Sequence, residues 1–327
     1  MSQVPWRAEL AASFTRVEDL LQFLELPTQA LLQSSLEAAS HFPFRVTRSY
    51  AERMRKGDEA DPLLRQVLPV AEELREQPGF SADPVGDLAA VAATGVLQKY
   101  HGRALLVTTG ACAINCRYCF RREFPYGEEQ MSRQHEAAAL DYLAAEPSVA
   151  EVILSGGDPL VLSDERLGAL IGKIAALGHV RRLRIHSRLP VVLPSRVTES
   201  FLSLFTRTRL RSVLVIHANH AREIDGSVSA ALRALGAAGV TLLNQSVLLK
   251  GVNDSVEDLA GLSEALFASG VSPYYLHALD KARGTAHFDL PLSEAMRLHE
   301  GLRRKLPGYL VPKLVREEPG EPYKVLL

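Results

Sequence analysis

The sequence predicts an α/β fold: a partial (β/α)6 barrel with a helical N-terminal extension and a C-terminal tail that closes the barrel mouth. From residue 104 onward, short runs rich in Val, Ile, Leu and Tyr alternate six times with segments of helical character. Such runs are typical of strands. Six β-then-α units in succession favour a parallel sheet with helices outside it. They are too few for a closed eightfold barrel.

Each strand and helix of the barrel is predicted from its own segment. The strands are expected at residues 104–109, 149–154, 181–186, 212–217, 240–248 and 272–279. The helices are expected at residues 132–145, 164–176, 194–206, 221–238, 255–268 and 292–305. In parallel barrels the chemistry lies at the carboxyl ends of the strands, so we expect the functional residues in the loops that follow these runs.

The two ends of the chain differ from the barrel. Residues 7 to about 98 have helical character and no alternation typical of strands. We expect a helical extension over 1–98, the barrel over 99–307 and the tail over 308–327. The extension is expected to cap the barrel, with a dimer contact as the alternative. The tail contains three prolines, but its apolar residues at 309–311 and 314–315 predict that it packs.

The composition is that of an ordinary globular protein. Of the 327 residues, 47% are hydrophobic and 23% are charged, and the formal net charge is −1. A nearly neutral chain has no global positive field that would attract nucleic acid. The N-terminus has no signal-peptide pattern, and charged residues interrupt every long apolar stretch. We therefore expect a cytoplasmic protein with no membrane contact and no nucleic-acid partner.

All three cysteines of the chain lie in one short segment. Cys112, Cys116 and Cys119 are spaced C-x3-C-x2-C. Thiolates bind iron–sulfur clusters, and three of them can hold three irons of a [4Fe-4S] cube, which leaves the fourth iron open to a small molecule. A structural zinc site would need a fourth ligand, for which His101 is a distant candidate. Three buried thiols are the other alternative. The spacing resembles that of the radical S-adenosylmethionine (SAM) enzymes.

A glycine-rich turn follows the second predicted strand. It reads Ser155, Gly156, Gly157, Asp158 and Pro159. Two glycines let a backbone approach a ligand closely, although a plain strand-to-helix turn shows the same pattern. Because it follows the cysteine loop by one βα unit, the turn resembles the glycine-rich element of the radical SAM enzymes, which meets the amino group of SAM.

Arginines recur near the predicted strand ends. Arg121 stands two residues after Cys119, so a folded cysteine loop holds it at the site. A guanidinium is suited to bidentate binding of a substrate carboxylate. Arg103, on the first strand, and Arg188, just after the third, are candidates for binding a phosphate. The alternative for each of them is a solvated surface charge.

Four longer motifs carry a more specific resemblance. They are residues 99–106 (KYHGRALL), 116–126 (CRYCFRREFPY), 187–194 (SRLPVVLP) and 244–254 (NQSVLLKGVND). With them the chain resembles the lysine 2,3-aminomutase family, and within it the short bacterial branch that acts with elongation factor P. The resemblance extends from about residue 6 to the C-terminus.

The resemblance implies three cofactors: the [4Fe-4S] cluster, SAM and pyridoxal 5′-phosphate (PLP). PLP needs a Schiff-base lysine, and the matching position is Lys324, with Lys313 as the runner-up. Arg103 and Arg188 would then bind the PLP phosphate, and Gln245 would bind SAM together with residues 155–158. Because the cluster takes all three cysteines, we expect no zinc.

The resemblance also implies a site for the substrate's side-chain ammonium. Asp280 and Glu317 fall where the family places the two carboxylates of this site, and a pair of acids selects a cation. Two features depart from the family pattern. Glu317 replaces the more usual aspartate, and residues 320–323 replace most of the glycines that precede the lysine in longer members.

The implied activity is the conversion of L-lysine to (R)-β-lysine. A 5′-deoxyadenosyl radical, formed from SAM with an electron from an electron donor, would take a hydrogen from the β-carbon. Nitrogen would then move from C2 to C3, and the hydrogen would return to the product. The product would be attached to elongation factor P by a separate ligase. The alternatives are an aminomutase for another amino acid such as glutamate, a PLP-independent radical SAM enzyme acting on a peptide or nucleic acid, and a non-catalytic zinc protein. The sequence does not determine whether the protein forms a homo-oligomer.

Overall fold

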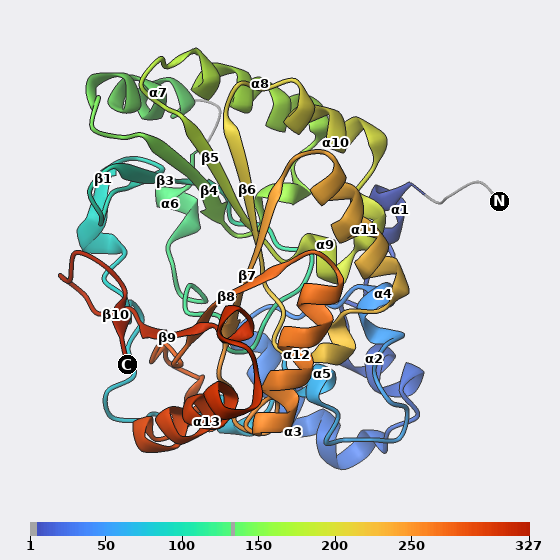
Figure 1. The fold of residues 1–327 in the computed structure, drawn as a ribbon. Coiled ribbons are helices and arrows are strands. Elements are labelled where there is room, and N and C mark those ends of the chain that lie inside the picture. The colour runs from blue at the N-terminus through green and yellow to red at the C-terminus, as the bar shows by residue number, and fades with distance from the viewer. Residues whose placement is uncertain (1–4, 132–134) are drawn as a thin grey trace.

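The computed structural model describes residues 5–131 and 135–327. Its centre is a ten-stranded sheet whose strands pair in the order of the sequence, from β1 to β10 (Figure 1). The six strands of the barrel are parallel to one another. They are β3 (Arg103–Thr109), β4 (Glu151–Gly156), β5 (Arg182–Ser187), β6 (Arg211–Ile216), β7 (Thr241–Val247) and β8 (Ser272–His277). The predicted partial barrel is confirmed, because the sheet stays open between β1 and β10.

Helices alternate with these strands. They are α7 (Glu136–Ala145), α8 (Asp164–Ala176), α10 (Glu199–Thr206), α11 (Gly226–Ala237), α12 (Val256–Ala268) and α13 (Leu292–Lys305). Four of them begin at a side-chain cap. Ser163, Thr198, Asp225 and Ser255 each accept a hydrogen bond from the backbone N–H three residues later, which satisfies a donor that the first helical turn leaves unpaired.

Two of the predicted helices are wrong in extent. The segment 194–206 divides into η4 (Pro194–Arg196) and α10, because Thr198 is extended and caps α10. The segment 221–238 divides in the same way into η5 (Ala221–Glu223) and α11 at the cap Asp225. In the helix predicted over 132–145, residues 132–134 lie outside the described residues. The remaining short elements of the barrel are α6 (Tyr126–Glu129), η3 (Pro159–Val161), α9 (Leu189–Val192) and η6 (Ala286–Phe288).

The N-terminal extension is helical except at its end. It contains α1 (Trp6–Ala11), α2 (Val17–Phe23), α3 (Thr28–His41), α4 (Arg48–Ala51), α5 (Pro62–Arg65), η1 (Ala71–Leu74) and η2 (Leu88–Ala90). The prediction that it carries no strand is wrong. β1 (Val91–Ala93) and β2 (Val96–Leu97) form a hairpin that pairs with β3. Strands this short show no alternation, and Gly95, with φ of +80°, makes the turn between them.

The C-terminal tail extends the sheet. After η7 (Gly308–Leu310), β9 (Lys313–Arg316) pairs in parallel with β8, and β10 (Val325–Leu326) returns antiparallel to β9. β9 is therefore a further parallel strand of the barrel, preceded by α13. Glu317 follows the carboxyl end of β9 directly, and Lys324 directly precedes β10. The tail thus returns the chain to the end of the barrel where parallel strands carry their functional residues.

The main apolar core lies between the sheet and the helices. Leu154 of β4 and Ile185 of β5 are buried, as are Leu170 and Ile174 of α8, and all four belong to one hydrophobic cluster. Burying an aliphatic side chain of this size contributes about 1.5–3 kcal/mol. This packing leaves the other face of the strands to line the interior of the barrel.

The N-terminal extension also holds the loop that contains the cysteines. The side chain of Arg117 is fully buried and donates to both carboxylate oxygens of Glu73 in η1, at 2.8 and 2.6 Å. Arg122 pairs with the same carboxylate at 2.8 Å. The backbone N–H of Arg117 donates to the Gln66 carbonyl at 2.9 Å. The extension therefore packs on the barrel loop that contains the cysteines and forms its outer wall.

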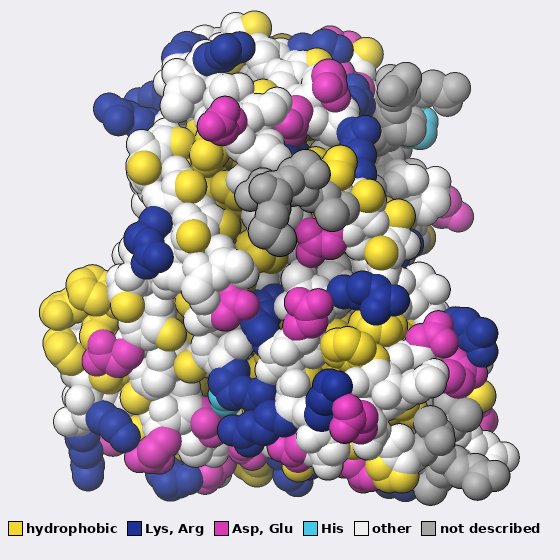
Figure 2. Space-filling model, turned by 90° about the vertical axis from the view of Figure 1, so that its right-hand side faces the viewer, with side chains coloured by type: hydrophobic (Ala, Val, Ile, Leu, Met, Phe, Trp, Pro, Cys, Tyr) yellow, Lys and Arg dark blue, Asp and Glu magenta, His cyan; other side chains and the backbone are white. Residues whose placement is uncertain are grey.

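The surface in Figure 2 shows Lys and Arg side chains interspersed with Asp and Glu. This mixing agrees with a net charge of −1. Within residues 5–131 and 135–327, none of the helices combines the length and the apolar character needed to cross a lipid bilayer.

We expect Glu73→Gln to destabilise the protein strongly. The substitution removes the charge that Arg117 and Arg122 share and leaves a fully buried guanidinium without a counter-charge. Removing one partner of a buried ion pair costs about 3–5 kcal/mol. Urea denaturation of the cofactor-free protein measures the loss. Glu257→Gln, which removes an exposed pair with Lys305, should cost less than about 1 kcal/mol. An equal loss of unfolding free energy in the two variants would contradict a stabilising role for the ion pairs of Glu73 with Arg117 and Arg122.

Candidate active site

A cavity of about 350 Å³ lies inside the sheet and extends to the carboxyl ends of its parallel strands. This is the size range of small-molecule sites. The structure brings to its wall all fourteen residues that the sequence singled out. They are Arg103, Cys112, Cys116, Cys119, Arg121, Ser155, Gly156, Gly157, Asp158, Arg188, Gln245, Asp280, Glu317 and Lys324. Their individual roles stay predictions. Lys313, the runner-up to Lys324, is exposed.

The loop after β3 presents the three thiols to this cavity. Cys112, Cys116 and Cys119 are free of disulfides and partly exposed. A tight turn, in which the N–H of Cys119 donates to the Cys116 carbonyl at 3.1 Å, brings the last two together. Burial raises the pKa of Cys119 to about 11 and that of Cys112 well above its usual range. Both thiols therefore need a bound cation before they ionise at neutral pH.

The described side chains do not converge on a single metal ion. Within residues 5–131 and 135–327, no group of three His, Cys, Asp or Glu is placed to hold one ion. In a four-iron cube each thiolate binds a different iron, so the three ligands stand apart. Three separate thiols on one wall of a cavity are therefore a donor set that fits a cluster.

The glycine turn after β4 packs directly on the cysteine loop. The N–H of Gly157 donates to the Thr109 carbonyl at 2.7 Å, and the N–H of Asp158 donates to the Ala111 carbonyl at 2.9 Å. A Cβ on Gly157 would stand 2.4 Å from the Ala111 oxygen, and Gly156 has φ of +112°. Both glycines are thus required by the close approach of two backbones.

The Asp158 side chain is occupied within the fold. Its carboxylate accepts four hydrogen bonds of 2.7–3.0 Å, three from backbone N–H groups and one from the Ser187 hydroxyl. These bonds tie the end of β4 to the end of β5. Asp158 is therefore a structural residue of the turn, and the neighbouring Ser155 hydroxyl accepts a hydrogen bond from Arg121 at 3.1 Å.

The two arginines proposed for a phosphate have different surroundings. The terminal nitrogens of Arg188 donate to Cys116 Sγ at 2.7 Å, to Glu223 at 2.9 Å and to two further side chains. Only its Nε is buried without a partner among the described residues. Arg103 stacks on the Tyr100 ring at 4.5 Å and has no hydrogen-bond acceptor in the described part of the chain. Arg188 is thus committed to protein groups beside the cysteines, and Arg103 is not.

Five side chains of alternating charge form a continuous ion chain along the cavity wall. Arg121 Nε donates to Asp87 at 2.6 Å, and the other oxygen of Asp87 lies 2.6 Å from Lys99 Nζ. Lys99 also pairs with Glu317 at 2.9 Å, and Glu317 pairs through its second oxygen with Lys324. Asp87 and Lys99 were missed by sequence reasoning. Lys99 opens one of the recognised motifs, whereas nothing in the sequence marks Asp87.

The cations of this ion chain keep its two carboxylates ionised. Burial by itself would raise the pKa of Glu317, but the charges of Lys324 and Lys99 outweigh it and lower that pKa to about 2. The pKa of Asp87 is lowered in the same way, because Arg121 and Lys99 outweigh its burial. Both groups therefore stay charged throughout the neutral range.

Asp280, three residues after β8, has a different environment. Its Oδ1 is buried without a hydrogen-bond partner among the described residues. Burial raises the pKa of Asp280 to about 7, although the charge of Lys324 acts against this. A buried polar atom without a partner is costly unless a ligand supplies one. Asp280 and Glu317 face the same cavity and are suited to share a cation there.

Three histidines on the cavity wall were also missed. His186 on β5, His217 directly after β6 and His277 on β8 all line the cavity, and Nε2 of the first and third is buried without a partner in the described part of the chain. Burial lowers the pKa of His217 to about 3 and those of His186 and His277 well below the usual value. All three are neutral at pH 7. The sequence does contain a signal that could have found them, because each histidine lies at or near the end of a predicted strand.

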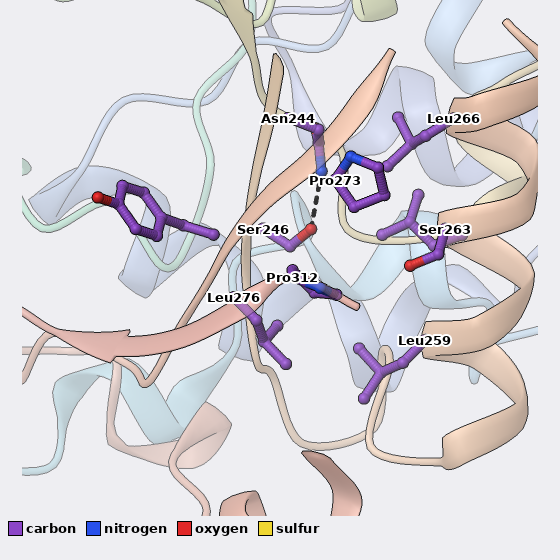
Figure 3. A pocket seen from close by; sticks show the side chains of 10 residues that line it. Asn244, Ser246, Leu259, Ser263, Leu266, Pro273, Leu276 and Pro312 are labelled. Carbon is purple, nitrogen blue, oxygen red and sulfur yellow. Dashed lines mark hydrogen bonds between the residues drawn. The ribbon is translucent and has the colours of Figure 1, made fainter. Parts of the chain in front are cut away.

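A second, much smaller cavity lies between the sheet and α12 (Figure 3). Its volume is about 10 Å³, which is room for about one water molecule. Asn244 Nδ2 donates to Ser246 Oγ at 2.8 Å and to the Ala218 carbonyl at 3.1 Å, so these polar groups already satisfy one another. This space is a packing defect on the far side of the strands from the cysteines.

Comparison with known proteins finds a matching family model and several similar chains. The model of the Radical SAM superfamily matches residues 106–262. The chain is 48% identical to L-lysine 2,3-aminomutase of Escherichia coli (strain K12), over 100% of this chain and 95% of that protein. It is 46% identical to the Haemophilus influenzae protein of the same name, over 98% and 95%. The L-lysine 2,3-aminomutase of Clostridium subterminale is 35% identical, over 96% and 76%. A solved radical SAM methyltransferase from Sphaerobacter thermophilus aligns with a TM-score of 0.47 and 19% identity, over 68% of each chain.

We expect Asp280→Asn to stabilise the cofactor-free protein more as the pH rises. An unfolded Asp ionises near pH 3.9, whereas burial raises the pKa of Asp280 to about 7. The wild type therefore loses stability between about pH 4 and about pH 7, and the loss then levels off. Asn has no such loss, so the advantage of the variant should grow over this range, to at most about 4 kcal/mol. Urea denaturation at a series of pH values measures it, and a difference independent of pH would contradict a raised pKa.

Proposed function

The chain belongs to the L-lysine 2,3-aminomutase family of radical SAM proteins, and on that premise we propose that it is an isomerase that converts L-lysine to (R)-β-lysine. One observation carries the proposal. Three cysteines from the loop after β3 and Lys324 from the tail line the same cavity, although they are far apart in the sequence. A thiolate set for a [4Fe-4S] cluster and an amine for PLP thus face a common space.

The cysteine wall would hold the cluster and SAM. Cys112, Cys116 and Cys119 would each ligate one iron, and Ser155 and Gln245 would contact SAM together with the backbone of the glycine turn. Cluster and SAM, when bound, supply the 5′-deoxyadenosyl radical that takes a hydrogen from the substrate. The neighbouring Arg188 donates to Cys116 Sγ at 2.7 Å, so its guanidinium would hold this side chain beside the cluster. We therefore assign Arg188 to the support of Cys116 and keep Arg103 for the PLP phosphate.

The tail would hold PLP through Lys324. PLP, when bound, supplies the imine through which nitrogen migrates between carbons. The carboxylate of Glu317 pairs with Lys324 Nζ in the cofactor-free chain. With Lys324 engaged by PLP, this oxygen of Glu317 would be available to another cation.

The substrate would be held at its two charged ends. Nε of Arg121 is taken by Asp87 and Nη1 by Ser155. Nη2 has no hydrogen-bond partner among the described residues and would take the substrate carboxylate. Asp280 Oδ1 has no partner among the described residues, and together with Glu317 it would receive the side-chain ammonium. A glutamate or a neutral side chain would leave this pair of acids unpaired in a buried place, which disfavours it.

The wider role comes from the resemblance to the branch that acts with elongation factor P. We propose that the product supplies a ligase that attaches β-lysine to elongation factor P, and that a cellular electron donor reduces the cluster.

A product assay tests the proposal, with Cys116→Ser as the comparison. Protein reconstituted anaerobically with iron and sulfide is given SAM, PLP, a reductant and L-lysine, and mass spectrometry separates α- from β-lysine. The wild type should form β-lysine. Cys116→Ser should reduce SAM cleavage to background, because one iron of the cluster loses its thiolate. SAM cleavage without the thiolate would contradict the cluster assignment, and cleavage by the wild type with lysine unchanged would contradict the substrate.

The assignment of Lys324 is tested against Lys313. We expect Lys324→Ala to keep its iron and lose the visible absorbance of the PLP imine. Lys313→Ala, which alters an exposed residue of the same tail, should keep both. The absorbance spectrum and the iron content of the two purified variants measure this, and an unchanged imine band in Lys324→Ala would move the assignment to another lysine.

A further inference from the structure

Lys99 lies in the connection between β2 and β3 with its ammonium fully engaged. Its Nζ contacts the Val85 carbonyl at 2.7 Å, Asp87 Oδ1 at 2.6 Å and Glu317 Oε1 at 2.9 Å. These three acceptors use the three donors of an ammonium group. Only 17% of its side chain is exposed, and 3% and 16% of those of Asp87 and Glu317. The pairs are therefore desolvated and ordered, unlike surface ion pairs.

The contact between Lys99 and Glu317 crosses the open edge of the barrel. The sheet is not closed, and its edge strands β1 and β10 lie at the left of Figure 1. Lys99 belongs to the edge before β3, and Glu317 follows β9 near the opposite edge. The ion pair therefore fixes the tail relative to the cysteine side of the cavity.

The two oxygens of Asp87 bind different cations, and so do those of Glu317. This arrangement indicates that Lys99 does more than connect two parts of the fold. Asp87 gives one oxygen to Lys99 and the other to Arg121. Glu317 likewise gives Oε1 to Lys99 and Oε2 to Lys324. Each carboxylate is thus anchored on one side by Lys99 and presents its second oxygen to a residue of the cavity. Lys99 contacts no residue to which we assign the radical chemistry.

We propose that Lys99 is a positioning residue that determines selection for a substrate with a side-chain ammonium, by holding Glu317 with Oε2 directed to the place that the Lys324 ammonium occupies. The inference rests on the proposed function and deepens it. In the cofactor-free chain Oε2 holds the Lys324 ammonium, which is a cation like that of the substrate. With Lys324 engaged by PLP, the substrate ammonium would bind in its place, between Oε2 and Oδ1 of Asp280, which has no partner among the described residues.

Without Lys99 this arrangement loses its anchor. Glu317 would be free to rotate, and the charge on its Oε1 would no longer be offset by Lys99. It would also face Asp280 with less positive charge nearby, so the two acids would repel each other when both are ionised. The affinity for a ligand with a side-chain ammonium would therefore fall, whereas the affinity for a ligand of the same length without the ammonium would not.

The test compares two ligands in Lys99→Met. PLP-loaded protein without reductant is titrated with L-lysine and with L-norleucine, which lacks the ammonium, and the change in visible absorbance gives each dissociation constant. We expect L-lysine to bind about 30-fold more weakly to the variant, and L-norleucine to change by less than about 3-fold. Lys99→Arg, which keeps a cation between the two carboxylates, should restore most of the affinity for L-lysine. Lys305→Met, which removes an exposed pair, should change neither constant.

Two kinds of result in this titration would overturn the proposal. Equal weakening of both ligands, or a loss of iron or of thermal stability in Lys99→Met alone, would make Lys99 a structural residue. An unchanged affinity for L-lysine would show that Glu317 needs no anchor. The titration needs no turnover, so it separates this inference from the proposed function. If the wild type prefers L-lysine to L-norleucine but forms no β-lysine under reducing conditions, the reaction is wrong and the role of Lys99 stands.

Discussion

The ion pair between Lys99 and Glu317 connects two parts of the molecule that the sheet leaves apart. β1 and β10 do not pair, so the position of the tail relative to the cysteine loop depends on β9 lying beside β8 and on contacts across the open edge. Glu317 is the carboxylate on which these contacts meet, because it binds Lys99 on one side and Lys324 on the other. If this carboxylate moved, the Lys324 amine and the proposed cation site would move with it.

The cysteine loop is held from two sides before any cluster binds. On the inside, Gly156 and Gly157 allow the turn after β4 to pack on the backbone of the loop. On the outside, the buried carboxylate of Glu73 binds Arg117 and Arg122. A site whose supporting residues are rigid keeps its ligands close to the geometry that chemistry needs. The N-terminal extension is therefore part of the structure that supports the site.

The barrel was predictable because six strand-and-helix units repeat the same local pattern, and strands such as β5 and β7 lie within one residue of their predicted runs. The hairpin of β1 and β2 was not, because strands of three and two residues carry no period and form only against β3. The cysteines were evident from their spacing, whereas Asp280, Glu317 and Lys324 could be selected only through resemblance to a family. Asp87 and Lys99 could not be identified in advance, since their importance comes from partners that only the folded chain brings near. Asp158 and Arg188 were found at the cavity, but their polar groups are used mainly by the protein itself.

The central claim is that the radical formed at the cysteines reaches a substrate bound at the tail within one cavity. Transfer of deuterium from the substrate tests it most directly. Wild-type protein is given L-lysine deuterated at the β-carbon, and the 5′-deoxyadenosine formed from SAM is analysed by mass spectrometry. The account predicts deuterium in the 5′-deoxyadenosine. Cleavage of SAM that yields 5′-deoxyadenosine without deuterium, while lysine retains its label, would contradict a shared cavity for the two chemistries.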